Sequence, residues 1–230
     1  MGPTINRCWA VLSIALAALA AALPADAHLR YFTYTYDWFT PWEGERELEL
    51  WWTQTEGGDA VWQLEFEYGV TRQYMVAPYL IFEREGGKTV LKGWKLEQRY
   101  AFGEQVYERV LPAVYLEVKK ERGEPYEIEA KLIGTYILET GWVISANLIA
   151  ERELASGAKV EWGYAAGVSR RISRNAWFGG EVFGDFAKNR HFIGPVAAWD
   201  VRRGQRLLGT VAVSLTGGPG QARLIYEYEF

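Results

Sequence analysis

The sequence predicts an all-β fold, an antiparallel transmembrane up-and-down β-barrel of about twelve strands. Three observations predict it. Large apolar and charged side chains alternate residue by residue along most of the chain, glycine and proline recur at short intervals between the alternating segments, and the chain ends on one more such segment. The i, i+3, i+4, i+7 spacing of an amphipathic helix is hard to find in the sequence, so we expect strands almost throughout.

The first 27 residues predict a cleaved export signal. Arg7 supplies a positive charge, residues 8–23 are dominated by Ala and Leu, and Ala25-Asp26-Ala27 has the small-x-small pattern of a cleavage site. This apolar run is shorter than the roughly 20 residues that a membrane-spanning helix needs. We therefore expect cleavage near Ala27, an exported chain that begins near His28, and an extended N-terminal segment over residues 28–43.

The remainder, residues 44–230, predicts a single barrel domain without a linker. The only cysteine, Cys8, lies in the predicted signal, so disulfides and thiolate metal sites are excluded from the exported chain. Two histidines and dispersed carboxylates show no metal-ligand spacing, and we predict neither a metal site nor a cofactor, although a cation held weakly by acidic residues of the lumen stays open. The 25 basic residues are dispersed and outnumbered by 29 acidic ones, which excludes a nucleic-acid partner.

Twelve alternating segments define the predicted strands, and most are joined by turns short enough to make neighbouring strands antiparallel. They are residues 44–55, 60–70, 73–84, 88–102, 111–121, 126–139, 142–154, 158–171, 174–187, 189–202, 205–217 and 221–230. The longest gap, residues 103–110, is compatible with a helical turn or with an extension of either neighbouring strand. Residues 31–36 also alternate, and we expect them in the barrel mouth or paired briefly with an edge.

Alternation alone does not say which face meets lipid, but the residue types on the apolar face do. That face is aromatic near the strand ends and often small in the middle, as at Gly180, Val182 and Gly184, which suits lipid better than a filled core. The aromatic positions expected at the two membrane interfaces are Trp62, Tyr68, Trp94, Tyr100, Tyr126, Tyr136, Trp142 and Trp162. We therefore expect the apolar face to point outward.

The last segment carries the most specific signal. Tyr226, Tyr228 and the terminal Phe230 share one face, while Glu227 and Glu229 share the other. This arrangement resembles the C-terminal recognition strand of bacterial outer-membrane proteins. The resemblance implies that the barrel-assembly machinery and outer-membrane lipid are partners, and that the bacterial outer membrane is the location.

Four segments in the first third of the chain extend the resemblance. They are residues 32–36 (FTYTY), 41–44 (PWEG), 47–51 (ELELW) and 67–71 (EYGVT). They resemble bacterial outer-membrane β-barrels that are distantly related to the phenol-degradation MetA-type transporters. The resemblance supports the location and carries no catalytic residues.

If the aromatic face meets lipid, the alternate positions face the lumen, and these are mostly acidic. The acidic positions are Glu47, Glu49, Glu65, Glu67, Glu97, Glu117, Glu127, Glu129, Glu151, Glu161, Glu181, Asp185, Glu227 and Glu229, and the basic ones are Lys95, Arg99, Lys119, Lys131, Arg206 and Arg223. A water-filled lumen with this excess of acid would favour cations. Alternatively, acids and bases pair and, with Trp51, Phe183 and Trp199, fill a closed interior.

Three functions stay open at this point. The first is a passive channel or transporter-like conduit for a small solute, with a preference for cations, and the second is a closed structural or interaction barrel without transport. The third is a lipid-modifying outer-membrane enzyme, which would bring Ser173, Asn175 and His191 together, although their spacing matches no known motif. We favour the conduit and predict that the chain is not an enzyme.

Overall fold

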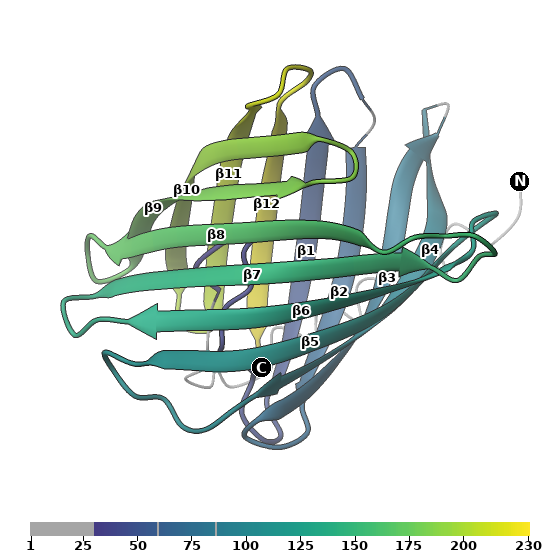
Figure 1. Cartoon of the computed structure of the whole chain (residues 1–230). Coiled ribbons are helices and arrows are strands. Elements are labelled where there is room, and N and C mark those ends of the chain that lie inside the picture. Colours follow the sequence, from purple (N-terminus) through teal and green to yellow (C-terminus); the bar gives the residue numbers. More distant parts are fainter. Residues whose placement is uncertain (1–29, 59, 86) are drawn as a thin grey trace, which may run out of the picture.

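The computed structural model describes residues 30–58, 60–85 and 87–230, and they form a closed antiparallel barrel of twelve strands (Figure 1). Each strand pairs with the next along the chain, and β12 pairs with β1 to close the sheet. Closure satisfies the backbone hydrogen bonds that two free edges would leave unpaired. The predicted export signal, residues 1–27, and His28 lie outside the described residues.

The strands match the predicted segments to within a few residues. They are β1 (Arg46–Thr55), β2 (Ala60–Gly69), β3 (Tyr74–Glu85), β4 (Lys88–Ala101), β5 (Val110–Glu121), β6 (Tyr126–Ile137), β7 (Trp142–Glu153), β8 (Glu161–Arg171), β9 (Ala176–Asp185), β10 (Arg190–Arg202), β11 (Gln205–Ser214) and β12 (Gln221–Glu229). The gap at residues 103–110 contains a turn and no helix, and β5 begins at its last residue. Among the described residues, no helix is long and apolar enough to cross a membrane.

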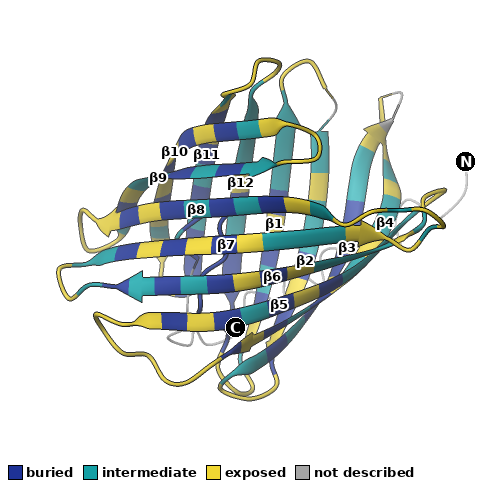
Figure 2. Ribbon diagram, in the orientation of Figure 1, coloured by how far each residue is buried: buried dark blue, intermediate teal, exposed yellow. Residues whose placement is uncertain are grey.

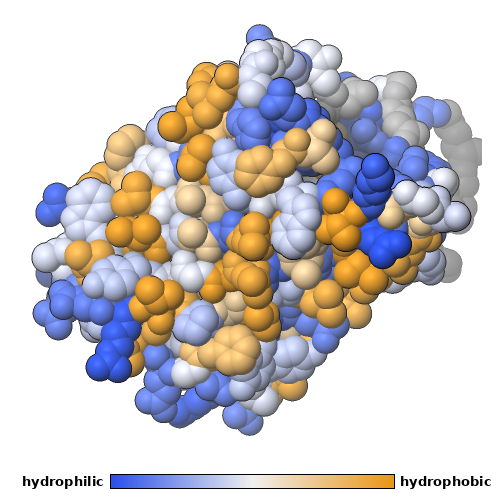
Figure 3. Space-filling model, viewed as in Figure 1, coloured by the Kyte–Doolittle hydropathy of each residue, from blue (hydrophilic) through white to orange (hydrophobic). Residues whose placement is uncertain are grey.

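Side chains alternate between the inside and the outside of the barrel, so buried and exposed bands succeed one another along each strand (Figure 2). On β1, for example, Glu47, Glu49 and Trp51 are buried, whereas Leu50 is 49% exposed. The predicted interface aromatics point outward. The exposed fractions of the most exposed ones range from 37% for Tyr68 to 50% for Trp162. Apolar side chains spread across the face formed by β5–β8, while hydrophilic ones gather toward the strand ends (Figure 3).

Trp199 is the exception to the predicted facing. It is 53% exposed on the outer surface of β10, where Val196 and Ala198 are buried inside. The inner positions are odd-numbered on β9 and even-numbered on β10, because the connection between them shifts the alternation by one residue. The prediction that Trp199 fills the interior is therefore wrong.

Residues 30–41 run inside the barrel and do not form a thirteenth strand. Among the described residues, no backbone–backbone hydrogen bond joins this segment to a strand. The expectation that this segment pairs with an edge strand is therefore wrong, and it lies inside the barrel toward one end. Six of its twelve side chains are aromatic, and the barrel interior is a better place to bury them than a sheet edge.

Candidate functional site

The segment of residues 30–41, which we call the plug, is held by barrel side chains that bond to its backbone. Glu181 on β9 makes the largest contribution. One of its oxygens accepts hydrogen bonds from the backbone N–H of Thr33 at 3.0 Å and from its hydroxyl at 2.6 Å. The other oxygen accepts from the N–H groups of Tyr34 at 2.8 Å and Thr35 at 3.0 Å. A buried carboxylate satisfied in this way anchors the middle of the plug.

Polar side chains on β6 and β7 hold the following residues of the plug. The side-chain amide of Asn147 accepts from the N–H of Tyr36 at 2.7 Å and donates to its carbonyl at 2.8 Å. The hydroxyl of Ser145 donates to the same carbonyl at 2.7 Å, and that of Thr135 accepts from the N–H of Trp38 at 2.9 Å. Extended backbone that forms no ladder is thereby satisfied inside the barrel.

Three arginines complete the attachment by donating to backbone carbonyls of the plug. Arg206 donates to Arg30 at 2.8 Å, Arg223 donates to Thr33 at 3.1 Å, and Arg99 donates to Phe39 at 2.8 Å. The sequence placed all three arginines in the lumen. In the structure they bind the plug.

Apolar packing closes the barrel around the plug. Phe32, Tyr36 and Trp38 belong to one buried cluster with side chains of β5–β7, such as Leu111 and Ile133. The ring of Phe32 lies against Gly167 on β8, where an added Cβ would come within 2.5 Å of the ring. This cluster and the hydrogen bonds close the end of the barrel where the even-numbered strands finish, which we call the plugged end.

Above the plug, a cavity of about 480 Å³ extends toward the other end of the barrel, which we call the open end. Aromatic rings form much of its base: Tyr34 and Tyr36 come from the plug, and Trp51 comes from β1. Tyr34 stacks on Phe183 with ring centroids 3.8 Å apart. The base therefore combines flat apolar surfaces with polar groups, as in many sites for small ligands.

Charged side chains on the cavity wall are balanced in number and largely paired. Lys95 lies 2.8 Å from Glu117, Lys131 lies 2.8 Å from Glu129, and Lys119 lies 2.5 Å from Glu127. The six acidic and six basic residues that line the cavity are Glu117, Glu121, Glu127, Glu129, Glu151, Asp185, Lys95, Lys119, Lys131, Lys188, Arg190 and Arg223. This balance gives no support to a cation preference of the cavity.

The excess of acid lies instead beside the plug, in a group that we call the glutamate array. It consists of Glu47, Glu49, Glu65, Glu67, Glu227 and Glu229, all buried on the inner face of β1, β2 and β12. Arg30 of the plug lies 3.4 Å from Glu49, and Arg99 lies 3.1 Å from Glu67 and 3.1 Å from Glu97. The plug thus brings a positive charge to the array.

Burial changes the ionisation of plug side chains that lie outside the strands. It raises the pKa of the Tyr31 phenol to about 12, against the opposing effect of Arg206. It also raises the pKa of the Asp37 carboxyl, which the charges of Arg99 and Arg30 partly offset. At the rim of the open end, a hydrogen bond to Glu161 raises the pKa of the Lys188 ammonium group.

The predicted lumen residues fall into three groups in the structure. Glu47, Glu49, Glu65, Glu67, Glu97 and Arg99 lie at or beside the glutamate array, Glu181 and Arg206 hold the plug, and Lys95, Glu127, Glu129, Lys131, Asp185 and Arg223 line the cavity. Sequence reasoning missed Arg30, Thr135, Ser145 and Asn147 as site residues. The last three occupy inward positions of the alternation, where a polar residue was a usable signal.

The residues imagined as a catalytic group are not brought together. Ser173 and Asn175 lie in the turn between β8 and β9, whereas His191 lies near the start of β10, beyond the other end of β9. A strand of this length separates the two places by roughly 30 Å. His191 lies 3.3 Å from the hydroxyl of Tyr164. These three residues therefore cannot act as one catalytic site.

Comparison with known proteins supports the fold and shows no closer relationship. No family model matches the sequence, nor does any curated protein, so the predicted likeness to the MetA-type barrels is not confirmed. Among solved structures, the chain is similar to a KdgM porin in complex with disordered oligogalacturonate, with a TM-score of 0.66, 6% identity, and coverage of 80% of this chain and 99% of that one.

Two further channels are similar over most of their length. An outer membrane channel from Pseudomonas putida F1 gives a TM-score of 0.61 and 9% identity over 88% of this chain and 100% of that one. The NanC porin gives 0.60 and 8% identity over 79% and 98%. With the closed sheet described above, these similarities show that the chain has the barrel fold of outer-membrane porins.

Proposed function

We propose that this chain is an outer-membrane conduit for a small polar solute, and that the plug closes it at one end. The observation that carries the proposal is the cavity itself, which opens at one end of the barrel and ends on Tyr34 and Tyr36 of the plug. A solute that enters the open end is stopped by the plug, which is not part of the barrel wall. Transport then requires that the plug move.

The way in which the plug is attached supports this mechanism. Its backbone bonds to side chains such as Glu181 and Asn147, and in the described part of the chain it makes no backbone–backbone hydrogen bond to a strand. Leaving the barrel would therefore break no strand pairing, and the closed sheet would persist. Segments of this kind, with few backbone contacts to the scaffold, are the ones that open locally at the lowest cost.

The outer surface supports the membrane location. Large apolar side chains such as Leu80, Leu132 and Val211 are 41% to 66% exposed on the outside of the strands. An exterior with so many exposed apolar side chains is a liability in water and is expected of a barrel embedded in lipid. We propose in addition that export depends on residues 1–27 and that Tyr226, Tyr228 and Phe230 form the assembly signal.

Single-channel recording on the refolded exported chain tests the proposal. We expect the whole exported chain to insert with little conductance, and a variant that lacks residues 28–41 to give stable conductance steps. Both proteins should first show the heat-dependent gel shift of a closed barrel, which is the control for folding. A folded deletion variant that inserts without conducting would favour a closed structural or interaction barrel.

A further inference from the structure

The six glutamates of the array form two rows across three neighbouring strands. Glu47 on β1 lies directly opposite Glu229 on one side and Glu67 on the other. Glu49 lies opposite Glu227 and Glu65 in the same way. Like charges at directly opposite positions of a sheet repel, and burial removes the water that would screen them. The array therefore needs a source of positive charge.

The described arginines supply only part of that charge. Arg30 pairs with Glu49 and also donates its backbone N–H to Glu227 at 3.2 Å. Arg99 forms ion pairs with Glu67 and Glu97. Within the described part of the chain, no ion pair reaches Glu47 or Glu65.

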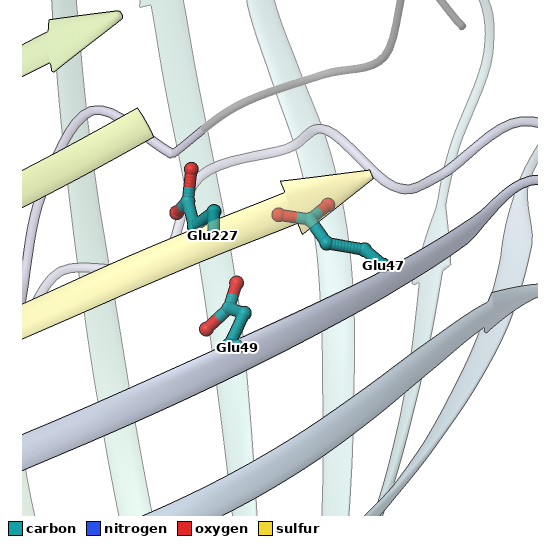
Figure 4. A group of neighbouring side chains, drawn as sticks. All are labelled: Glu47, Glu49 and Glu227. Atoms are coloured by element: carbon teal, nitrogen blue, oxygen red, sulfur yellow. The ribbon is translucent and has the colours of Figure 1, made fainter. Parts of the chain in front are cut away.

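Unpartnered oxygen atoms mark where the missing charge belongs. Glu47, Glu49 and Glu227 each keep one buried carboxylate oxygen, Oε1, without a hydrogen-bond partner in the described structure. Carboxylate oxygens of these three residues lie within 4.8 Å of one another, and their side chains come from the neighbouring strands β1 and β12 (Figure 4). Two ligands of one calcium ion, each about 2.4 Å from it, are at most that far apart.

Glu65 provides an independent indication from the next strand. Its side chain is fully buried, and neither of its carboxylate oxygens has a hydrogen-bond partner among the described residues. It lies opposite Glu49, and oxygens of the two residues come within 4.8 Å. An unpaired buried carboxylate at this place is expected where a cation supplies the missing interaction.

We propose that Glu47, Glu49 and Glu227 bind a divalent cation, and that this cation is calcium, with Glu65 adding negative charge from β2. Oxygen ligands select a hard cation, and a buried site of several protein carboxylates favours calcium over magnesium, which usually keeps several waters and binds through only one or two carboxylates. The ion lies where β12 closes the barrel onto β1 and next to Arg30. It ties the two ends of the barrel sheet together and completes the wall against which the plug rests.

Metal analysis and thermal melting of the refolded exported chain test this site. We expect protein refolded with calcium to retain a stoichiometric amount of it after dialysis, and to melt several degrees higher than the same protein refolded in EDTA. Glu47→Gln should lose both the bound calcium and this shift in Tm. Glu129→Gln, which changes an inward glutamate of the cavity wall, is the matched control and should keep both.

The EDTA samples distinguish a ligand from a residue that is merely structural. Without calcium, Glu47→Gln should melt higher than the wild type, because it removes one uncompensated buried charge. If Glu47→Gln fails to fold, Glu65→Gln gives the same comparison, with weakened instead of abolished calcium binding. Wild-type protein that holds no calcium and melts at one temperature with and without EDTA would overturn the proposal.

Magnesium offered at the same concentration should not reproduce the shift in Tm. A shift of equal size with magnesium would overturn the assignment to calcium. None of these readouts depends on whether the barrel conducts. The proposal of a cation site and the proposal of a conduit are therefore tested independently.

Discussion

Thr33 donates two hydrogen bonds to a single oxygen of Glu181, one from its backbone N–H at 3.0 Å and one from its hydroxyl at 2.6 Å. The same oxygen accepts from the hydroxyl of Thr210 on β11 at 2.9 Å. One carboxylate of the barrel wall thus links the plug to two strands. The loss of this carboxylate should loosen the plug without breaking the backbone hydrogen bonds between strands.

Glu181→Ala should therefore open the barrel. Hydrogen bonds to a charged group contribute about 1.5 to 3 kcal/mol each, so the loss of even one such bond shifts plug occupancy roughly tenfold or more. We expect frequent conductance steps in planar bilayers, where the wild type shows few. Glu181→Gln should lie between the two, since an amide keeps only one acceptor oxygen. An alanine variant as silent as the wild type would show that Glu181 does not hold the plug.

Gly167→Val should displace the plug by steric means alone. A Cβ at Gly167 would come within 2.5 Å of the Phe32 ring, and overpacking of this kind costs about 1 to 3 kcal/mol. Conductance should rise, and proteolysis of the folded barrel should cut the released N-terminal segment. Gly180→Val is the matched control, because a Cβ there meets only the carbonyl of Gly194, at 3.5 Å. Equal behaviour of the two variants would contradict the packing that we describe.

Ion preference in the plug-free barrel should follow the charges of the cavity wall. The wall carries six acidic and six basic residues, so we expect a reversal potential near zero in a salt gradient. Replacing Lys119 and Lys131 by Gln should shift the potential toward cations. Replacing their partners Glu127 and Glu129 by Gln should shift it toward anions. A strong cation preference before any substitution would mean that the glutamate array controls permeation.

Phe230→Ala should impair assembly in cells more than folding in the test tube. The backbone N–H of Phe230 donates to the carbonyl of Arg46 at 3.0 Å, which an alanine retains, and its ring stacks on Tyr228 with centroids 5.7 Å apart. If the ring is an assembly signal, the amount of heat-modifiable barrel in outer membranes should fall several-fold. Refolding into detergent should give nearly the wild-type yield. A parallel loss in both assays would indicate a purely structural role.

The sequence determined the strands because alternation is a local property. In any strand that contains them, Leu48 and Leu50 must lie on one face and Glu49 on the other. The short glycine turns force neighbouring strands to be antiparallel. Strand number, strand boundaries and the outward aromatics followed from this pattern. Local alternation did not fix the facing of Trp199, because its phase depends on the connection before β10.

Only the tertiary structure decided what occupies the lumen. Residues 31–36 alternate as a strand does, yet Glu181, Asn147 and Arg223 bond to their backbone from three distant parts of the chain. Likewise, Glu47, Glu49, Glu65 and Glu227 form one array only because β12 closes onto β1 in one register. Periodicity assigns each side chain to a face, whereas barrel closure sets which inward residues meet, and that depends on contacts between residues far apart in sequence.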